Sequence, residues 1–174
     1  MGLKQSLIEK KKSILERWFH LILETYPPET SKFIRKEKDR FVNPVGVTLS
    51  EGMETIYEGL LKETEAEQLT GPLEKIIQIR SVQDFSPSQA VAIVSLLKRA
   101  VQEEMKESKV EMNGMNGMIM EWFDLESRID QLTLMAFDIY TKYRERVYEI
   151  RINEIKKERD RVFKLLERTN SKAK

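Results

Sequence analysis

Arg80, Gln83 and Asp84 are the polar side chains whose types and spacing could support chemistry. Arg80 and Asp84 are four residues apart, so on a helix their side chains lie on one face and can form an ion pair. Alternatively, the Arg80 guanidinium could bind a small anion, with Gln83 supplying further hydrogen bonds. Ser86 and Pro87 follow, and they are typical of the N-cap and the first residue of a helix. We therefore expect a helix–helix corner, in which a structural ion pair is the simpler role for Arg80.

The chain has very few of the residues that most often bind metals or act as nucleophiles and bases, namely cysteine and histidine. There is no cysteine and one histidine, His20. Metal sites with cysteine ligands and thiol catalysis are therefore excluded. A metal site with two histidine ligands is excluded too, because the chain has a single histidine. A serine–histidine–aspartate triad has His20 as its only possible base. No phosphate-binding loop and no dinucleotide fingerprint occurs. We expect no metal, no cofactor and no enzymatic activity.

The charge balance argues against nucleic acid and anionic membranes as the main partners. Lysine and arginine total 30 and aspartate and glutamate total 29, which gives a net charge of +1 over 174 residues. The N-terminal stretch lacks the uninterrupted apolar segment of a signal peptide, and no apolar run reaches the length of a membrane span. We therefore expect a cytoplasmic protein. Charged residues make up 34% of the chain, which predicts long solvated helical faces.

Apolar residues recur at helical spacing through most of the chain, which predicts an all-α fold. The periodicity predicts helices at residues 3–26, 29–41, 47–61, 72–83, 87–106 and 118–168. We expect a turn at residues 43–46, with Thr48 or Ser50 capping the third helix, and a polar loop at residues 62–70. Two Asn-Gly pairs predict a hinge or loop within residues 112–120. Apolar residues cover most of the fifth helix, so we expect it at the centre of a compact bundle.

The last helix is too long for the bundle that precedes it. Residues 118–168 in one helix would span roughly 75 Å. We expect residues 1–117 to form the core, 118–145 to be the last core helix, and 146–174 to protrude as a coiled-coil extension with a frayed end. The alternative is a single exposed, charged helix stabilised by i,i+4 ion pairs. The coiled coil would pair two chains through apolar residues at heptad-like spacing: Ile139, Tyr143, Val147, Ile150, Ile155, Val162 and Leu165.

Three motifs resemble those of a known family. They are an aromatic element that runs from Trp18 to Pro27, the segment DRFVNPVG at residues 39–46, and the segment IRSVQDFSPSQA at residues 79–90. The last motif is long and is the most specific of the three. With these motifs, residues 5–145 resemble the RsbRD N-terminal domain family, the sensor domain of RsbR-type co-antagonists that act with the stressosome kinase RsbT.

The resemblance implies a non-haem, globin-like sensor domain that dimerises and passes a signal along its C-terminal helix. In RsbR-type proteins that helix leads into a STAS output domain, whereas this sequence ends at Lys174 without one. We therefore expect either a stand-alone family member or a domain whose output lies on another chain that the coiled coil recruits. Haem needs an axial ligand on the proximal helix, and His20 lies on the first helix, so we expect no haem. The candidates to line a ligand pocket are Trp18, Phe41, Tyr57, Arg80 and Trp122.

We expect a non-enzymatic sensor or regulatory domain of a bacterial signalling system, dimeric through its last helix. The alternative is an adaptor or assembly protein that binds a respiratory or redox enzyme complex. A pocket in the globular half, with Arg80 pointing inward, would favour sensing. A solid core and a large exposed apolar groove would favour the adaptor.

Overall fold

The computed structural model describes residues 2–37, 39–83, 85–107 and 115–172, and this part of the chain is helical almost throughout. No strand occurs in these residues, so the all-α prediction is confirmed. A short 3₁₀ helix, η1 (Ala66–Leu69), precedes α5. The α-helices are α1 (Leu3–Glu9), α2 (Lys11–Leu23), α3 (Pro28–Lys36), α4 (Pro44–Leu61), α5 (Thr70–Val82), α6 (Pro87–Glu107) and α7 (Met115–Lys172).

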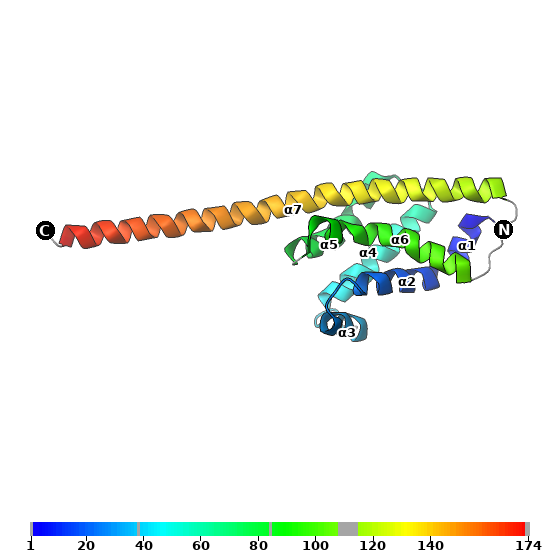
Figure 1. Cartoon of the computed structure of the whole chain (residues 1–174), viewed down its shortest axis with the longest axis horizontal. Helices are drawn as coiled ribbons and strands as arrows, with labels where there is room; N and C mark the ends of the chain where they lie inside the picture. Colours follow the sequence, from blue (N-terminus) through cyan, green and yellow to red (C-terminus); the bar gives the residue numbers. More distant parts are fainter. Residues whose placement is uncertain (1, 38, 84, 108–114, 173–174) are drawn as a thin grey trace.

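The first half of α7 is the element against which the rest of the domain packs. It lies along α5, α6 and α1, while α6 packs on α2 and α4 packs on α5 (Figure 1). Its inner face buries Leu125, Ile129, Leu132, Ala136 and Tyr140, whose spacing keeps the side chains on one face of the helix. These residues join the buried faces of the other helices in one hydrophobic core, which confirms the predicted compact bundle.

The first predicted helix is in fact two helices that meet at Lys10. The Lys10 amide still donates to the Ser6 carbonyl at 3.0 Å, but α1 turns away from the axis of α2. The bend lets α1 bury Leu3 and Leu7 and pack on α4 and α7. No glycine or proline marks the position, so the contacts of α1 with distant helices determine the bend.

Asn43 starts α4 three residues earlier than the sequence predicted. Its side-chain oxygen accepts from the Gly46 amide at 2.9 Å, and its Nδ2 donates to two backbone carbonyls at the end of α3, at 2.9 and 2.7 Å. Pro44 takes the first helical position, where a backbone N–H is not needed. A Cβ at Gly46 would overlap the Asn43 amide. Residues 43–46 are therefore a capped helix start and not the predicted turn, and residues 48 and 50 lie inside the helix.

Other helix boundaries also differ from the prediction. α3 ends at Lys36 instead of residue 41, and η1 lies within the predicted loop at residues 62–70. α7 begins at Met115, so residues 115–120 are helical and not part of a loop, while residues 112–114 lie outside the described part. The globin-like arrangement that the resemblance implied stays a prediction.

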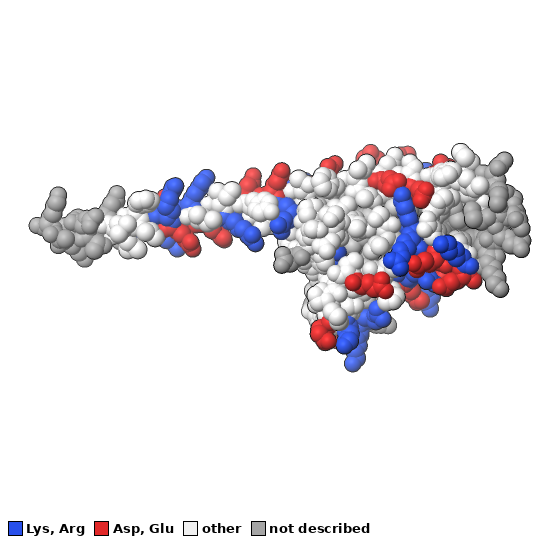
Figure 2. Space-filling view, in the orientation of Figure 1, with Lys and Arg blue, Asp and Glu red and all other residues white. Residues whose placement is uncertain are grey.

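The second half of α7 projects well beyond the domain (Figure 1). The 58 residues of α7 span about 87 Å at the rise of an α-helix. Near the end of the packed half, the Tyr143 hydroxyl donates to the Glu74 carboxylate at 3.0 Å and Arg144 donates to the Ser81 carbonyl at 3.4 Å. Every residue from 148 to 166 is exposed. Basic and acidic side chains are interspersed along the projecting part (Figure 2).

Candidate functional site

The Arg80 side chain is fully enclosed at the corner between α5 and α6. Its guanidinium carbon lies 3.4 Å from the centre of the Phe85 ring and 4.9 Å from that of Tyr26, and Nη2 donates to the Gln89 carbonyl at 3.1 Å. Nε and Nη1 have no hydrogen-bond partner in the described part of the chain. Burial lowers the pKa of Arg80, because the charged form loses its hydration. Asp84 lies outside the described residues, so the expected Arg80–Asp84 ion pair stays a prediction.

The other corner residues hold the start of α6. Ser86 and Gln89 form a reciprocal capping box: the Gln89 amide donates to the Ser86 hydroxyl at 3.3 Å, and the Ser86 amide donates to the Gln89 side chain at 3.0 Å. Pro87 is the first residue of α6. Gln83 accepts from the Tyr26 hydroxyl at 3.0 Å. These contacts join α2, α5 and α6 in a packed joint.

The structure does not bring the five expected pocket residues together. Trp18 and Tyr57 are core residues, whose side chains donate to backbone carbonyls of α6 and α1 at 2.8 and 3.0 Å. Burial raises the pKa of the Tyr57 phenol. Trp122 is partly buried against the core. Phe41 is 96% exposed and therefore lines no pocket.

His20 lies on the exposed side of α2, away from the core. Arg35 donates to its Nδ1 at 2.8 Å. Within the described ranges, no group of three or more histidine, aspartate and glutamate side chains could hold a metal ion. None of the helices in the described part is both long and apolar enough to cross a membrane.

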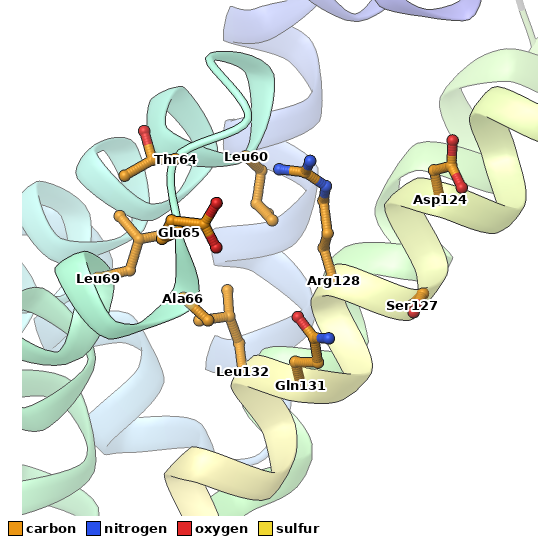
Figure 3. A pocket seen from close by; sticks show the side chains of 10 residues that line it. All are labelled: Leu60, Thr64, Glu65, Ala66, Leu69, Asp124, Ser127, Arg128, Gln131 and Leu132. Atoms are coloured by element: carbon orange, nitrogen blue, oxygen red, sulfur yellow. The ribbon is translucent and has the colours of Figure 1, made fainter.

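A polar cleft lies between α7 and the connection from α4 to α5, and we call it the α4–α7 cleft (Figure 3). Its volume is about 390 Å³, which is within the range of small-molecule sites. Buried leucines form its floor, and exposed or half-buried polar residues form its walls. The lining residues are Leu60, Thr64, Glu65, Ala66, Leu69, Asp124, Ser127, Arg128, Gln131 and Leu132.

The end of α4 shapes one wall of the cleft. The helix ends in a Schellman motif, in which the Thr64 amide donates to the Gly59 carbonyl at 2.9 Å and the Glu63 amide donates to a second carbonyl at 3.2 Å. Glu63 has a φ of 58°, in the left-handed region that glycine usually fills. Gly59 leaves space for Leu69 of η1, since a Cβ there would overlap the leucine methyl groups. The connection therefore turns sharply and stays close to α4, which places Glu65 opposite α7.

Charged side chains face each other across the cleft without pairing. Glu65 from the connection, and Arg128 and Gln131 from α7, point into the space between the two elements (Figure 3). Arg128 forms no hydrogen bond or ion pair with any of the residues that the structure describes. Lys4 donates to the Glu63 carboxylate at 2.7 Å, and this hydrogen bond, with a smaller contribution from Arg128, lowers the pKa of Glu63. The cleft thus offers charges of both signs to a small ligand.

None of the cleft residues was among the site residues that the sequence predicted. They come from two segments far apart in the chain, and the acidic residues near residue 65 are typical of a solvated loop. One local signal exists: Arg128 is the only basic residue in the stretch 121–130, among four acidic ones. An isolated charge of opposite sign on a helix is a weak signal, because most such residues are solvated.

Comparison with known protein families gives a match over most of the chain. The family model described as "RsbT co-antagonist protein rsbRD N-terminal domain" matches residues 12–155. This range includes α2 apart from its first residue, all of α3 to α6, and most of α7. No curated protein and no solved structure matches the chain.

Proposed function

This chain belongs to the RsbT co-antagonist rsbRD N-terminal domain family, as its motifs predicted, and we propose that it is a sensor or regulatory domain without enzymatic activity that acts as a homodimer. In this proposal α7 transmits the signal, and the output lies on a protein partner of the stressosome type. The family match supports the regulatory role. The observation that carries the dimer is the outer face of α7.

The outer face of α7 carries an apolar stripe with heptad spacing. In the projecting half the stripe comprises Tyr148, Ile152, Ile155, Val162 and Leu166, separated by four, three, seven and four residues. Their side chains are 49–65% exposed. Alternating steps of four and three residues align side chains along the seam of a two-chain coiled coil. Pairing these residues with the same residues of a parallel second chain would remove the apolar surface from water.

Exposed apolar residues also occur over the globular half, on the side of α7 that faces away from the core, and Thr141 and Glu145 separate them from the stripe of the projecting half. Phe123, Leu134 and Phe137 are exposed there. Leu134 is two residues from the buried Leu132 and from the buried Ala136, a spacing that puts it on the opposite face of the helix. A seam along both halves would link the domain and the projecting part through one continuous helix. A shift of α7 in the domain would then reach its distal end.

The proposed seam differs from the one that the sequence predicted. Ile139 packs against this chain's own core and Tyr143 donates to α5, so neither side chain is free to face a second copy. Ile155 and Val162 belong to both seams. The other predicted residues lie off the outer stripe: Val147, which is half-buried, and Ile150 and Leu165, which are exposed.

Light scattering of the full chain tests this proposal. We expect a mass of twice the 20.5 kDa of one chain. Replacing Ile152→Glu together with Ile155→Glu places charges in the seam, and the variant should have the mass of one chain while its helical circular dichroism persists. The matched control, Asn153→Glu together with Lys157→Glu, alters the opposite face and should remain dimeric. A monomeric wild-type chain, or a dimer that survives the seam substitutions, would contradict the proposal.

An adaptor or assembly protein for a respiratory or redox enzyme complex is the second candidate function. A groove between α1, α2 and α4 supports it, because this groove has a volume of about 580 Å³ and contains the apolar side chains of Ile8, Leu15, Phe19 and Met53. Such a groove suits an apolar segment of a partner protein. A wild-type chain that stays monomeric at micromolar concentration would favour this function over the first.

A further inference from the structure

We propose that the α4–α7 cleft binds a small zwitterion, an α-amino acid with an apolar side chain. This inference rests on the proposed sensing role and names the class of signal that the domain would detect. The position of the cleft suits that role, because one of its walls is α7 itself. Three features of the cleft carry the inference: an unpaired guanidinium, an opposed carboxylate and an apolar floor.

Arg128 supplies the anion-binding part of the site. Its guanidinium is half-buried beside the cleft and has no hydrogen-bonding or ionic partner among the described residues. It also borders a second hollow, which contains Lys4 and Glu121. A guanidinium binds a carboxylate through two parallel N–H donors, so a ligand carboxylate in the cleft would meet the unused donors of Arg128. Gln131, which points into the same space, can donate to the same carboxylate (Figure 3).

Glu65 supplies the cation-binding part. Its carboxylate points into the cleft from the wall opposite α7, and it does not form an ion pair with Arg128 (Figure 3). Asp124 adds a second carboxylate along the α7 wall. With two carboxylates and one guanidinium, the lining has a net charge of −1, which disfavours a simple anion such as phosphate. A simple cation would leave Arg128 without a partner, whereas an ammonium and a carboxylate on one ligand satisfy both walls.

The floor of the cleft selects an apolar side chain. Leu60, Leu69 and Leu132 are buried and line the space between the charged walls. Covering them with an aliphatic group removes apolar surface from water, which is favourable. The cleft volume of about 390 Å³ accommodates a ligand of this size. An amino acid such as leucine has the three groups that the two walls and the floor require.

Occupation of the cleft would add a polar link between two elements that otherwise contact each other through the leucines of the floor. A ligand held by both Glu65 and Arg128 ties the α4–α5 connection to α7. Arg128 also interacts electrostatically with Glu63, whose left-handed backbone conformation ends α4. Drawing Arg128 toward a ligand would weaken its interaction with Glu63. The ligand would therefore shift the position of α7 relative to the end of α4.

Calorimetric titration of the full chain with L-leucine tests the proposal. We expect saturable binding with one site per chain and a higher melting temperature in the presence of leucine. Isocaproate, which lacks the ammonium group, and isoamylamine, which lacks the carboxylate, should each bind at least about tenfold more weakly. Absence of binding by leucine and by every other apolar L-amino acid at millimolar concentration overturns the proposal. Equal binding of isocaproate or isoamylamine overturns the zwitterion.

Two charge-neutralising variants in the cleft locate the site, and two in the projecting half of α7 are matched controls. Arg128→Gln and Glu65→Gln should each weaken leucine binding by about tenfold or more. Arg151→Gln and Glu149→Gln change the same charges on the exposed half of α7 and should bind like the wild type. Unchanged binding by both cleft variants overturns the assignment to this cleft. Light scattering of the same samples reports the dimer independently, so failure of the ligand proposal is distinguishable from failure of the proposed function.

Discussion

Replacing Asn43 by aspartate should destabilise the protein, although aspartate caps helices about as well as asparagine does. Asn43 is 1% exposed. Its Oδ1 accepts from the Gly46 amide at 2.9 Å, and an aspartate oxygen would retain this contact. Its Nδ2 donates to the carbonyls of Ile34 and Glu37 at 2.9 and 2.7 Å. In the Asn43→Asp variant a carboxylate oxygen would face two carbonyl oxygens within hydrogen-bonding distance, with little water to separate them.

The size of the effect follows from the polar groups that lose their partners. An unpaired buried polar group costs about 1–3 kcal/mol, and loss of an N-cap costs about 0.5–2 kcal/mol. We expect Asn43→Ala to lower the free energy of unfolding by about 2–4 kcal/mol, because it removes the cap and both donated bonds. Asn43→Asp keeps the cap but adds repulsion, so we expect a loss of about 3 kcal/mol or more. Total stabilities of about 5–15 kcal/mol are typical, so both losses are measurable.

Urea unfolding followed by far-ultraviolet circular dichroism measures these losses. The matched control is Ser86→Asp, at the exposed N-cap of α6, where the free energy of unfolding should change by less than about 0.5 kcal/mol. At acidic pH the new carboxyl at residue 43 is protonated and can donate one hydrogen bond, so the loss in Asn43→Asp should shrink. An Asn43→Asp variant within about 0.5 kcal/mol of the wild type would refute the role of Nδ2 as a buried donor.

Substitutions at three further buried positions, with Gly71 as an exposed control, probe the packing of the domain. Arg80→Met should be more stable in urea than Arg80→Lys by about 1–3 kcal/mol, because methionine fills the space between the rings without a buried, underpaired ammonium. Ser13 donates a hydrogen bond to Glu104, and this bond is the main cause that lowers the pKa of the Glu104 carboxyl. Above pH 4.5, the ordinary pKa of a glutamate carboxyl, the ionised Glu104 therefore stabilises the fold. This contribution is lost as the pH falls through the lowered pKa. Glu104→Gln should therefore lower the melting temperature at pH 7 and reduce its dependence on pH in the acidic range. Gly59→Ala should cost about 1–3 kcal/mol through overlap with a leucine of η1, whereas Gly71→Ala, which meets open space, should be neutral or stabilising.

Helical periodicity predicted the bundle well, and the boundaries failed where distant contacts decide them. The apolar spacing located α2, α4, α5, α6 and α7, because burial of one face is a property of the local pattern. The bend at Lys10 has no local signal, since the packing of α1 on α4 and α7 produces it. The start of α4 was missed for another reason. Asn43-Pro44 and Gly46 are typical of a turn, but a buried asparagine that bonds α3 to α4 makes the same residues a helix start.

The candidate site was less accessible to sequence reasoning. The Arg80 corner was found because its residues are adjacent in the chain, but the ring contacts to Tyr26 and Phe85 depend on the fold. The α4–α7 cleft joins Glu65 to Arg128, and no spacing rule connects two residues so far apart. The outer stripe of α7 was only partly found, because the helix has two apolar faces and the sequence does not say which of them covers the core.

The central claim is that two copies of this chain pair along the apolar stripe on the outer face of α7. Disulfide cross-linking between the two copies of α7 is the most direct test of this claim. The chain has no cysteine, so Ile155→Cys introduces its sole thiol on the stripe and Asn153→Cys introduces one on the opposite face. In a parallel dimer the two thiols introduced at residue 155 lie close enough for a disulfide. We predict that mild oxidation converts the Ile155→Cys protein into a covalent dimer and leaves the Asn153→Cys protein as single chains on a denaturing gel. Equal cross-linking of the two variants, or no cross-linking of Ile155→Cys, would contradict the claim.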